Sequence, residues 1–172
     1  MNKEWPVRKH NRLIQYDYSQ NGAYFITICT ENRKCILSSI VGGGVLDAPS
    51  TRLTGYGLTV DRQIRDMNHQ YPDVQAEKYV IMPNHIHLLI RISKDWKFVQ
   101  SGPSGTPAPT NAVIPAYVST LKRLCNRKFG KNIWQRSYHD HIIRTDSDYQ
   151  MIWEYIDTNP ARWETDCFYT EE

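Results

Sequence analysis

Residues 78–92 read KYVIMPNHIHLLIRI, and two apolar stretches lie on either side of the pair Pro83-Asn84. Both stretches are rich in β-branched and other large apolar residues, which are typical of strands, whereas a proline followed by an asparagine is typical of a tight turn. The pattern therefore predicts a hairpin of two strands, over residues 78–82 and 85–92.

The second predicted strand has two different faces. Successive side chains on a strand point to opposite sides, so His85 and His87 project together from one face. The other face is entirely apolar and consists of Ile86, Leu88, Ile90 and Ile92. The apolar face is expected to lie on the core, and the two histidines are expected to face a ligand.

The segments around this hairpin alternate in type. Strand-like composition recurs over 23–30, residues 133–144 look mainly extended, and helical spacing of apolar residues extends over 58–69, 115–129 and 146–159. The resulting order is βαββαβ followed by one more helix. This order predicts an α+β protein with a ferredoxin-like (RRM-like) antiparallel sheet and an added C-terminal helix, with helices on one face of the sheet and the other face left for a ligand.

The 172 residues are expected to form one domain. Two stretches, 41–51 and 101–111, are so rich in glycine and proline that we interpret them as flexible surface insertions. The sequence contains neither a long apolar stretch nor a signal peptide, so the expected location is the cytoplasm. A nucleic-acid partner would add an association with the nucleoid. Four scattered cysteines without a Cys-x-x-Cys pair argue against a zinc knuckle and a disulfide framework.

The net charge of +3 is small, but the basic residues are unevenly distributed. No acidic residue occurs between Asp95 and Asp140. The basic residues that we expect to bind DNA are Arg8, Lys9, Arg12, Lys122, Arg123, Arg127, Lys128, Lys131 and Arg136. A run of basic residues is often only a solvated face, but the lack of carboxylates favours a polyanionic partner.

The pair His85 and His87 is close enough on a rigid strand to bind one metal ion. Two such histidines are more often exposed or hydrogen-bonded than metal-bound, so the pair alone decides neither the function nor the metal. A second pair, His139 and His141, flanks a carboxylate in place of an apolar residue. We interpret that segment as structural or DNA-facing.

The last predicted helix contains a tyrosine that the core does not require. Its apolar stripe consists of Tyr149, Ile152, Trp153 and Ile156. Tyr155 and Asn159 are four residues apart and share a face beside this stripe. We expect Asn159 to lie at the frayed end of the helix before Pro160, where its amide oxygen could reach a metal. On its own, a tyrosine in this position is usually a packing residue.

Four segments together resemble the single-tyrosine transposases of the HUH class, and within them the REP-associated tyrosine transposases. These segments are residues 24–33, 79–90, 134–144 and 155–160, and they span nearly the whole chain. The combination of Met-Pro-Asn-His-Ile-His with Tyr-Ile-x-x-Asn-Pro is far more specific than either motif alone. The insertions and the short tail after Pro160 differ from a minimal member of the family.

The resemblance implies a function and a set of site residues. It implies that Tyr155 is the nucleophile and that His85, His87 and Asn159 bind a divalent metal ion, Mg or Mn. It implies metal-dependent cleavage and strand transfer of single-stranded or hairpin DNA through a 5′-phosphotyrosine intermediate, in transposition or in processing of repetitive hairpins. Whether the active unit is a monomer or a homodimer stays open.

Three alternatives differ in the features that they require. A domesticated protein that only binds DNA hairpins would keep the basic surface without needing Tyr155 and the metal ligands. An RNA-binding sheet of the RRM type would need an aromatic pair where His85 and His87 stand. A metal-dependent hydrolase that uses water as its nucleophile would form no covalent DNA adduct.

Overall fold

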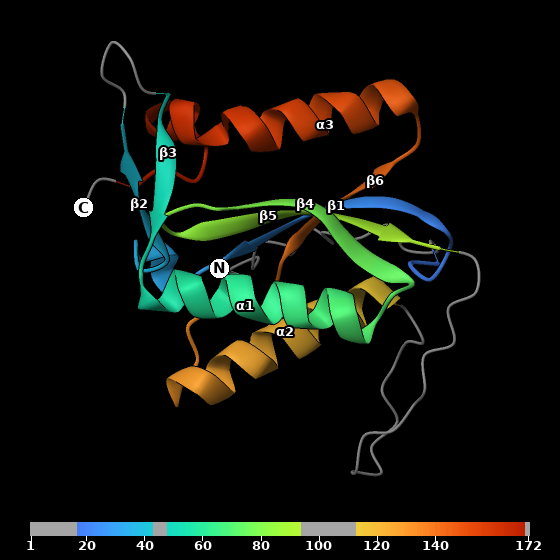
Figure 1. Ribbon diagram of the computed structural model, residues 1–172, viewed down its shortest axis with the longest axis horizontal. Helices are drawn as coiled ribbons and strands as arrows, with labels where there is room; N and C mark the ends of the chain where they lie inside the picture. Colours follow the sequence, from blue (N-terminus) through green and yellow to red (C-terminus); the bar gives the residue numbers. More distant parts are fainter. Residues whose placement is uncertain (1–16, 43–47, 94–112, 171–172) are drawn as a thin grey trace, which may run out of the picture.

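A computed structural model describes residues 17–42, 48–93 and 113–170 of the chain. Its centre is a four-stranded sheet whose strands lie in the order β4-β5-β1-β6, with every neighbouring pair antiparallel (Figure 1). These strands are β1 (Gly22–Cys29), β4 (Val74–Ile81), β5 (His85–Ile92) and β6 (His139–Ile143). The predicted hairpin of β4 and β5 is confirmed by their pairing.

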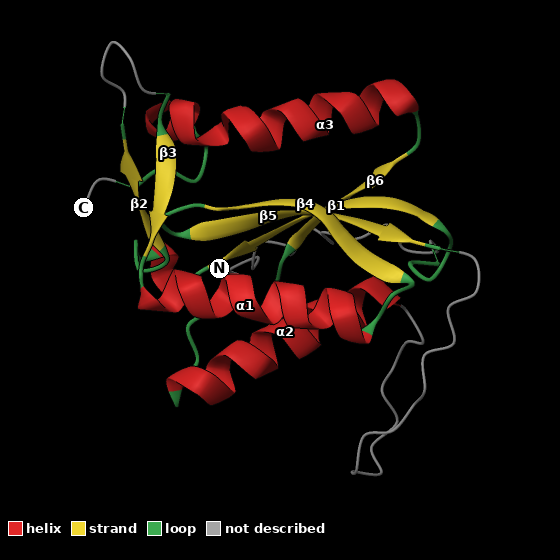
Figure 2. Ribbon diagram, viewed as in Figure 1, coloured by secondary structure: helices red, strands yellow, loops and turns green. Residues whose placement is uncertain are grey.

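Three α-helices cover the two faces of this sheet. They are α1 (Gly55–Gln70), α2 (Val113–Phe129) and α3 (Asp146–Thr158). The described residues also form two short 3-10 helices, η1 (Glu31–Arg33) and η2 (Asn159–Thr165). Helices α1 and α2 lie on one face, and α3 lies across the other (Figure 1, Figure 2). The four-stranded antiparallel sheet with its helices agrees with the prediction. The expectation that one face would be left uncovered is wrong, because α3 packs on it.

The alternation of side chains along β5 explains why helices pack on both faces of the sheet. Ile86, Leu88, Ile90 and Ile92 belong to the larger core, together with buried residues of α1 and α2. Leu89 points the opposite way and packs against Ile152 and Ile156 of α3 in a smaller second core. The apolar stripe predicted for the last helix is therefore the surface that attaches α3 to the sheet.

A second, two-stranded sheet was not predicted. It pairs β2 (Ser38–Val41) with β3 (Ser50–Leu53) in antiparallel register. The ends of the stretch 41–51 therefore lie in paired strands, so the interpretation of that whole stretch as a loop is wrong at both ends. The other glycine- and proline-rich stretch, 101–111, lies outside the described residues.

Two further boundaries differ from the prediction. Within residues 133–144 only β6 is a strand, preceded by an isolated bridge between Thr30 and Trp134. Helix α3 ends at Thr158, one residue before the predicted end, and its start is capped by Thr145, whose side chain accepts a hydrogen bond from the Asp148 amide. None of the helices in the described part of the chain has the length and apolar character needed to cross a membrane.

Candidate active site

His85 and His87 lie on the β5 face that α3 covers. Their side chains are almost completely buried, with relative exposures of 0% and 1%. The two Nε2 atoms are 3.0 Å apart. The alternation of β5 therefore places two imidazole nitrogens at one point, as the sequence predicted, but under a cover that it did not predict.

The hydrogen bond of His85 defines its tautomer. Its Nδ1 lies 2.8 Å from Oδ1 of Asn84. The Asn84 amide nitrogen donates to the Phe168 carbonyl at 2.8 Å, so its oxygen is oriented as an acceptor. His85 Nδ1 must then carry the proton, which leaves a lone pair on its Nε2.

The hydrogen-bond partner of His87 is a hydroxyl, which can either donate or accept. Nδ1 of His87 lies 2.8 Å from the hydroxyl oxygen of Thr27. When Thr27 accepts, the Nε2 atoms of His85 and His87 both present lone pairs to the same point. Such an arrangement suits a shared cation, with the two Nδ1 partners holding the rings in place.

Both imidazoles are held in the neutral form that binds metals. Burial lowers the pKa of His85 to about 4, and the nearby Arg33 also lowers it, although the Asp166 carboxylate opposes this shift. Burial, together with the neighbouring His85, lowers the pKa of His87 well below its usual value. At neutral pH, neither ring carries a second proton that would have to leave before a metal binds.

Tyr155 on α3 faces this pair of histidines. Its hydroxyl oxygen lies 3.4 Å from Nε2 of His87 and 3.3 Å from Oδ2 of Asp166. Its ring makes edge contacts with the rings of Phe25 and His87. Burial is the main cause that raises the pKa of Tyr155 to about 12, and the Asp166 carboxylate adds to it. The hydroxyl is therefore protonated at neutral pH and needs a nearby cation to become a nucleophile.

Asn159 lies directly after α3, at the start of η2, and is fully buried. The expectation of a frayed helix end is wrong, because the chain continues into η2. Its amide nitrogen donates to Oδ2 of Asp166 at 2.9 Å. Its Oδ1 is buried without a hydrogen-bond partner among the residues that the structure describes. Such an atom is rare in a folded protein and suggests that a group binds there.

Sequence reasoning missed Asp166. Its carboxylate and the ring nitrogens of His85 and His87 lie within 4.8 Å of one another. Its other oxygen, Oδ1, accepts a hydrogen bond from the Phe168 amide at 2.7 Å. Asp166 follows η2 in a segment without strand or helix periodicity, so no local pattern indicated that it would reach the histidines.

Comparisons with known proteins identify relatives in sequence and in fold. The chain is 32% identical over 177 residues to a functionally uncharacterised protein of Haemophilus influenzae strain Rd. This match covers 95% of this chain and 94% of that protein. It is also 26% identical over 159 residues to a second protein of that strain, which is provisionally named a REP-associated tyrosine transposase. This second match covers 85% of this chain and 74% of that protein. No family model matches the chain.

A solved structure has the same fold. It is a REP-associated tyrosine transposase bound to a REP hairpin, with a TM-score of 0.60 and 20% identity, and it covers 91% of this chain and 74% of that chain. The chain is therefore similar in sequence to a protein that bears this family's name, and it shares its fold with a solved member of that family.

The second histidine pair, His139 and His141, lies beside the cluster of His85, His87 and Asp166. Nε2 of His141 lies 2.9 Å from Oδ2 of Asp148, at the start of α3. His139 is exposed, and its ring centroid lies 5.9 Å from that of Phe168. Neither belongs to the group of His85, His87 and Asp166.

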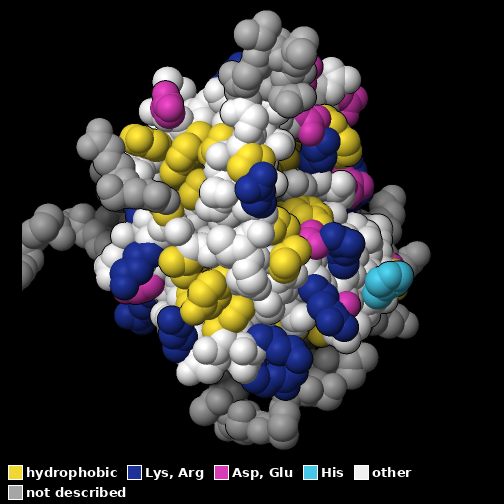
Figure 3. Space-filling view, turned by 60° about the vertical axis from the view of Figure 1, so that its left-hand side comes forward, with side chains coloured by type: hydrophobic (Ala, Val, Ile, Leu, Met, Phe, Trp, Pro, Cys, Tyr) yellow, Lys and Arg dark blue, Asp and Glu magenta, His cyan; other side chains and the backbone are white. Residues whose placement is uncertain are grey.

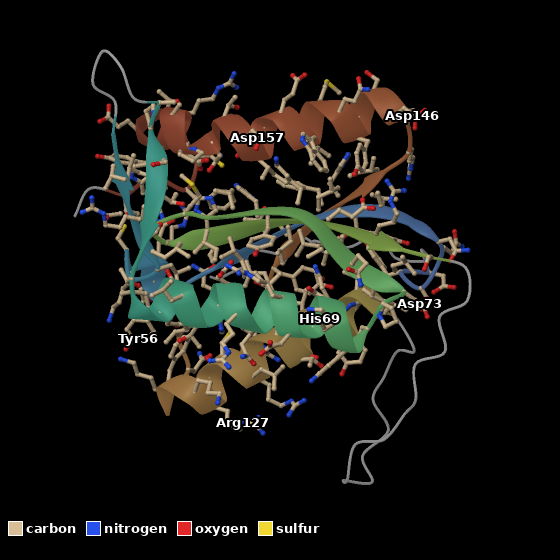
Figure 4. The ribbon with its side chains drawn as sticks, in the orientation of Figure 1. Tyr56, His69, Asp73, Arg127, Asp146 and Asp157 are labelled. Carbon is tan, nitrogen blue, oxygen red and sulfur yellow. The ribbon has the colours of Figure 1, made fainter. Side chains whose placement is uncertain are left out.

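Three of the basic residues proposed for DNA binding lie on the opposite side of the sheet from the histidine cluster. Arg8, Lys9 and Arg12 lie outside the described residues. Arg123, Arg127 and Lys128 are exposed on α2, which lies on the other side of the sheet from α3, as the labels of Arg127 and Asp157 show (Figure 4). On the face in Figure 3, Lys and Arg side chains gather in the lower part of the view, the level of α1 and α2 in Figure 1.

The other three predicted basic residues have different surroundings. The ammonium of Lys122 donates to the carbonyls of Gln135 and Ser137, so it stabilises the chain before β6. Lys131 lies over the ring of Tyr56, and Arg136 is exposed. Sequence reasoning did not select Arg33, whose guanidinium lies 5.3 Å from the ring centroid of Phe168 and so close to the histidines.

Proposed function

We propose that this protein cleaves one strand of DNA and transfers it through a 5′-phosphotyrosine intermediate. The observation that supports this proposal most directly is the position of the Tyr155 hydroxyl, 3.4 Å from Nε2 of His87. A candidate nucleophile and a pair of candidate metal ligands therefore face one point. Within this proposal the sheet is ferredoxin-like, and its C-terminal helix α3 supplies the nucleophile.

The residues at this point fit a divalent metal ion. His85 and His87 would bind it through their Nε2 atoms, and Asn159 would bind it through the Oδ1 atom that has no partner in the described residues. Nitrogen ligands suit Mn, and oxygen ligands suit both Mg and Mn. When bound, such an ion neutralises charge on the scissile phosphate and on the departing oxygen.

Tyr155 would supply the covalent chemistry. Its oxygen attacks the phosphorus and forms an O–P bond, while the bond from phosphorus to the 3′ oxygen breaks. The hydroxyl proton leaves Tyr155, and the departing 3′ oxygen takes up a proton to become a 3′ hydroxyl. A 3′ hydroxyl of another strand can then attack the phosphotyrosine, which restores Tyr155 and joins the strands without ATP.

The proposed substrate is single-stranded or hairpin DNA. The solved relative is bound to a REP hairpin, and the exposed basic residues of α2 offer this chain a surface for phosphates. We propose that Arg123, Arg127, Lys128, Lys131 and Arg136 contact the DNA backbone, with Arg8, Lys9 and Arg12 from the N-terminal segment. Lys122 would act indirectly, since it holds the backbone carbonyls before β6.

A covalent adduct assay tests the proposed function. The protein is incubated with Mg or Mn and a 3′-labelled single-stranded oligonucleotide that contains the hairpin repeats flanking its own gene. A labelled protein band that survives denaturation and depends on the metal is expected. Cleavage without any covalent adduct would instead indicate a hydrolase, and hairpin binding without cleavage would indicate a DNA-binding protein.

A further inference from the structure

We infer that Asp166 is a further protein ligand of the metal ion, and that the segment from Asp166 to Thr170 is therefore part of the metal site. This inference rests on the proposed metal-dependent function and adds a residue to its binding site. It also couples metal binding to the docking of a segment that follows η2.

The position of the carboxylate is the first argument. Its oxygen and the ring nitrogens of His85 and His87 lie within 4.8 Å of one another, a limit slightly above the roughly 4.2 Å that separates two opposite ligands at about 2.1 Å from one ion. Within residues 17–42, 48–93 and 113–170, this is the one group of three His, Cys, Asp or Glu ligand atoms with such spacing.

The charge of the site is the second argument. Imidazole binds a metal in its neutral form, and the amide of Asn159 has no charge, so these three ligands offer a buried divalent cation no negative partner. A buried charge is costly unless it is paired. Asp166 provides the missing negative charge at the same point, and its oxygen also matches the preference of Mg and Mn.

The third argument is that the two oxygens of Asp166 have different partners. Oδ1 accepts the hydrogen bond from the Phe168 amide, which fixes the carboxylate. Oδ2 faces the site, where it lies 2.9 Å from the Asn159 amide nitrogen and 3.3 Å from the Tyr155 hydroxyl. The same contact orients the Asn159 amide so that its Oδ1 is left without a partner among the described residues.

Residues 166–170 also help to hold His85 in place, through Asn84. The Asn84 amide donates to the Phe168 carbonyl and to the Thr170 hydroxyl, at 2.8 and 3.2 Å. Asn84 in turn orients His85. Metal binding and docking of residues 166–170 should therefore stabilise each other, because each holds groups that the other needs.

Titration calorimetry with Mn²⁺ in the absence of DNA tests this inference on the full chain. Asp166→Asn keeps an oxygen that can accept from Asn159 but removes the charge, and we expect it to weaken Mn²⁺ binding by at least ~10-fold. The matched control is Glu164→Gln, because Glu164 is an exposed acid two residues away. That variant should bind like the wild type, and thermal unfolding in EDTA would show that both variants are folded.

Hydrogen exchange of residues 166–170 gives a second readout. Mn²⁺ should slow exchange there in the wild type and in Glu164→Gln, and not in Asp166→Asn. Wild-type affinity in folded Asp166→Asn would overturn the inference, as would a wild type that binds no Mn²⁺. Because the assay contains no DNA, a wild type that binds Mn²⁺ but forms no covalent adduct would instead overturn only the proposed strand transfer.

Discussion

The hydroxyl oxygen of Tyr155 lies 3.4 Å from Nε2 of His87, although 68 residues separate the two in the chain. Two packing contacts create this proximity. Leu89, two residues after His87 on the same face of β5, packs against Ile152 and Ile156 of α3. The small core therefore sets the distance between the proposed nucleophile and the proposed metal ligand.

Tyr155→Phe is expected to abolish the covalent DNA adduct and strand cleavage together, because it removes the attacking oxygen and keeps the ring. The ring contacts with Phe25 and His87 remain, so the loss of stability should be about 1 kcal/mol or less. The adduct assay measures the first effect and thermal unfolding the second. Mn²⁺ binding should persist.

Tyr149→Phe is the control on the same helix. The Tyr149 hydroxyl donates to Glu77, and the Tyr149 ring packs against the second core. This variant should keep adduct formation. Tyr138, a buried tyrosine directly before β6, provides a second control. An adduct that persists in Tyr155→Phe and disappears in Tyr149→Phe or Tyr138→Phe would show that the nucleophile is assigned to the wrong residue.

The metal-free protein is expected to lose stability as the pH falls from about 6.5 toward 4. In this range His85 and His87 stay neutral when folded, because burial lowers their pKa values, and become protonated when unfolded. The unfolded chain then binds more protons, so each histidine lowers the free energy of unfolding by up to about 1.4 kcal/mol per pH unit. Urea unfolding in EDTA at several pH values measures this slope.

The double variant His85→Ala with His87→Ala serves as the comparison. It should lose most of this pH dependence, as well as metal binding and cleavage. It should also unfold more easily at neutral pH, because both side chains are buried and their removal leaves a cavity. A slope equal to that of the wild type would mean that other groups cause the acid sensitivity.

Neutralising Arg123, Arg127 and Lys128 of α2 is expected to weaken DNA binding at all sequences and to reduce its salt dependence. The three side chains lie on the other side of the sheet from Tyr155, so the cleavage rate at saturating DNA should change little. Fluorescence anisotropy at several salt concentrations measures the effect.

A control variant removes the same charge from other exposed positions, Arg52, Arg62 and Arg65. If this control weakens binding as much as the α2 variant, the attraction is a general effect of net charge. An unchanged salt slope in the α2 variant would show that α2 does not face the DNA.

Gly57→Ala should destabilise the protein by about 1 to 3 kcal/mol, because the added carbon would overlap the backbone carbonyl of Leu37. Gly55→Ala is the matched control in the same turn of α1, where an added carbon meets no atom of the described residues within 4 Å. Thermal unfolding of both variants measures the difference. Equal stability of the two would contradict the close packing of α1 on Leu37.

The main sheet could be predicted because its strands alternate clearly or follow turn residues. The hairpin of β4 and β5 is an example, since Pro83-Asn84 marks the turn and β5 has one wholly apolar face. The pair β2 and β3 was missed because each strand has only four residues and the glycine-rich stretch between them dominates the composition. Local patterns contain too little information about such short strands.

The site could be predicted only in part. Strand alternation places His85 and His87 together, and helical spacing places Tyr155 and Asn159 on one face. The proximity of these two residues to the histidines was implied by the family resemblance and not by spacing. Asp166 could not be predicted, because it reaches the histidines through tertiary packing of a segment without periodicity. The covering of the ligand face by α3 was missed for the same reason, since the apolar stripe of a helix does not say which surface it will meet.

The hydrogen bond from Asn84 to the Phe168 carbonyl has a consequence for synthesis on the ribosome. A nascent chain that has emerged as far as Ile156 already contains every strand of the sheet, both histidines and Tyr155. It still lacks Asn159, Asp166 and the carbonyl that orients Asn84. The sheet and its helices can therefore form first, and the proposed metal site is completed only when the following residues emerge and dock.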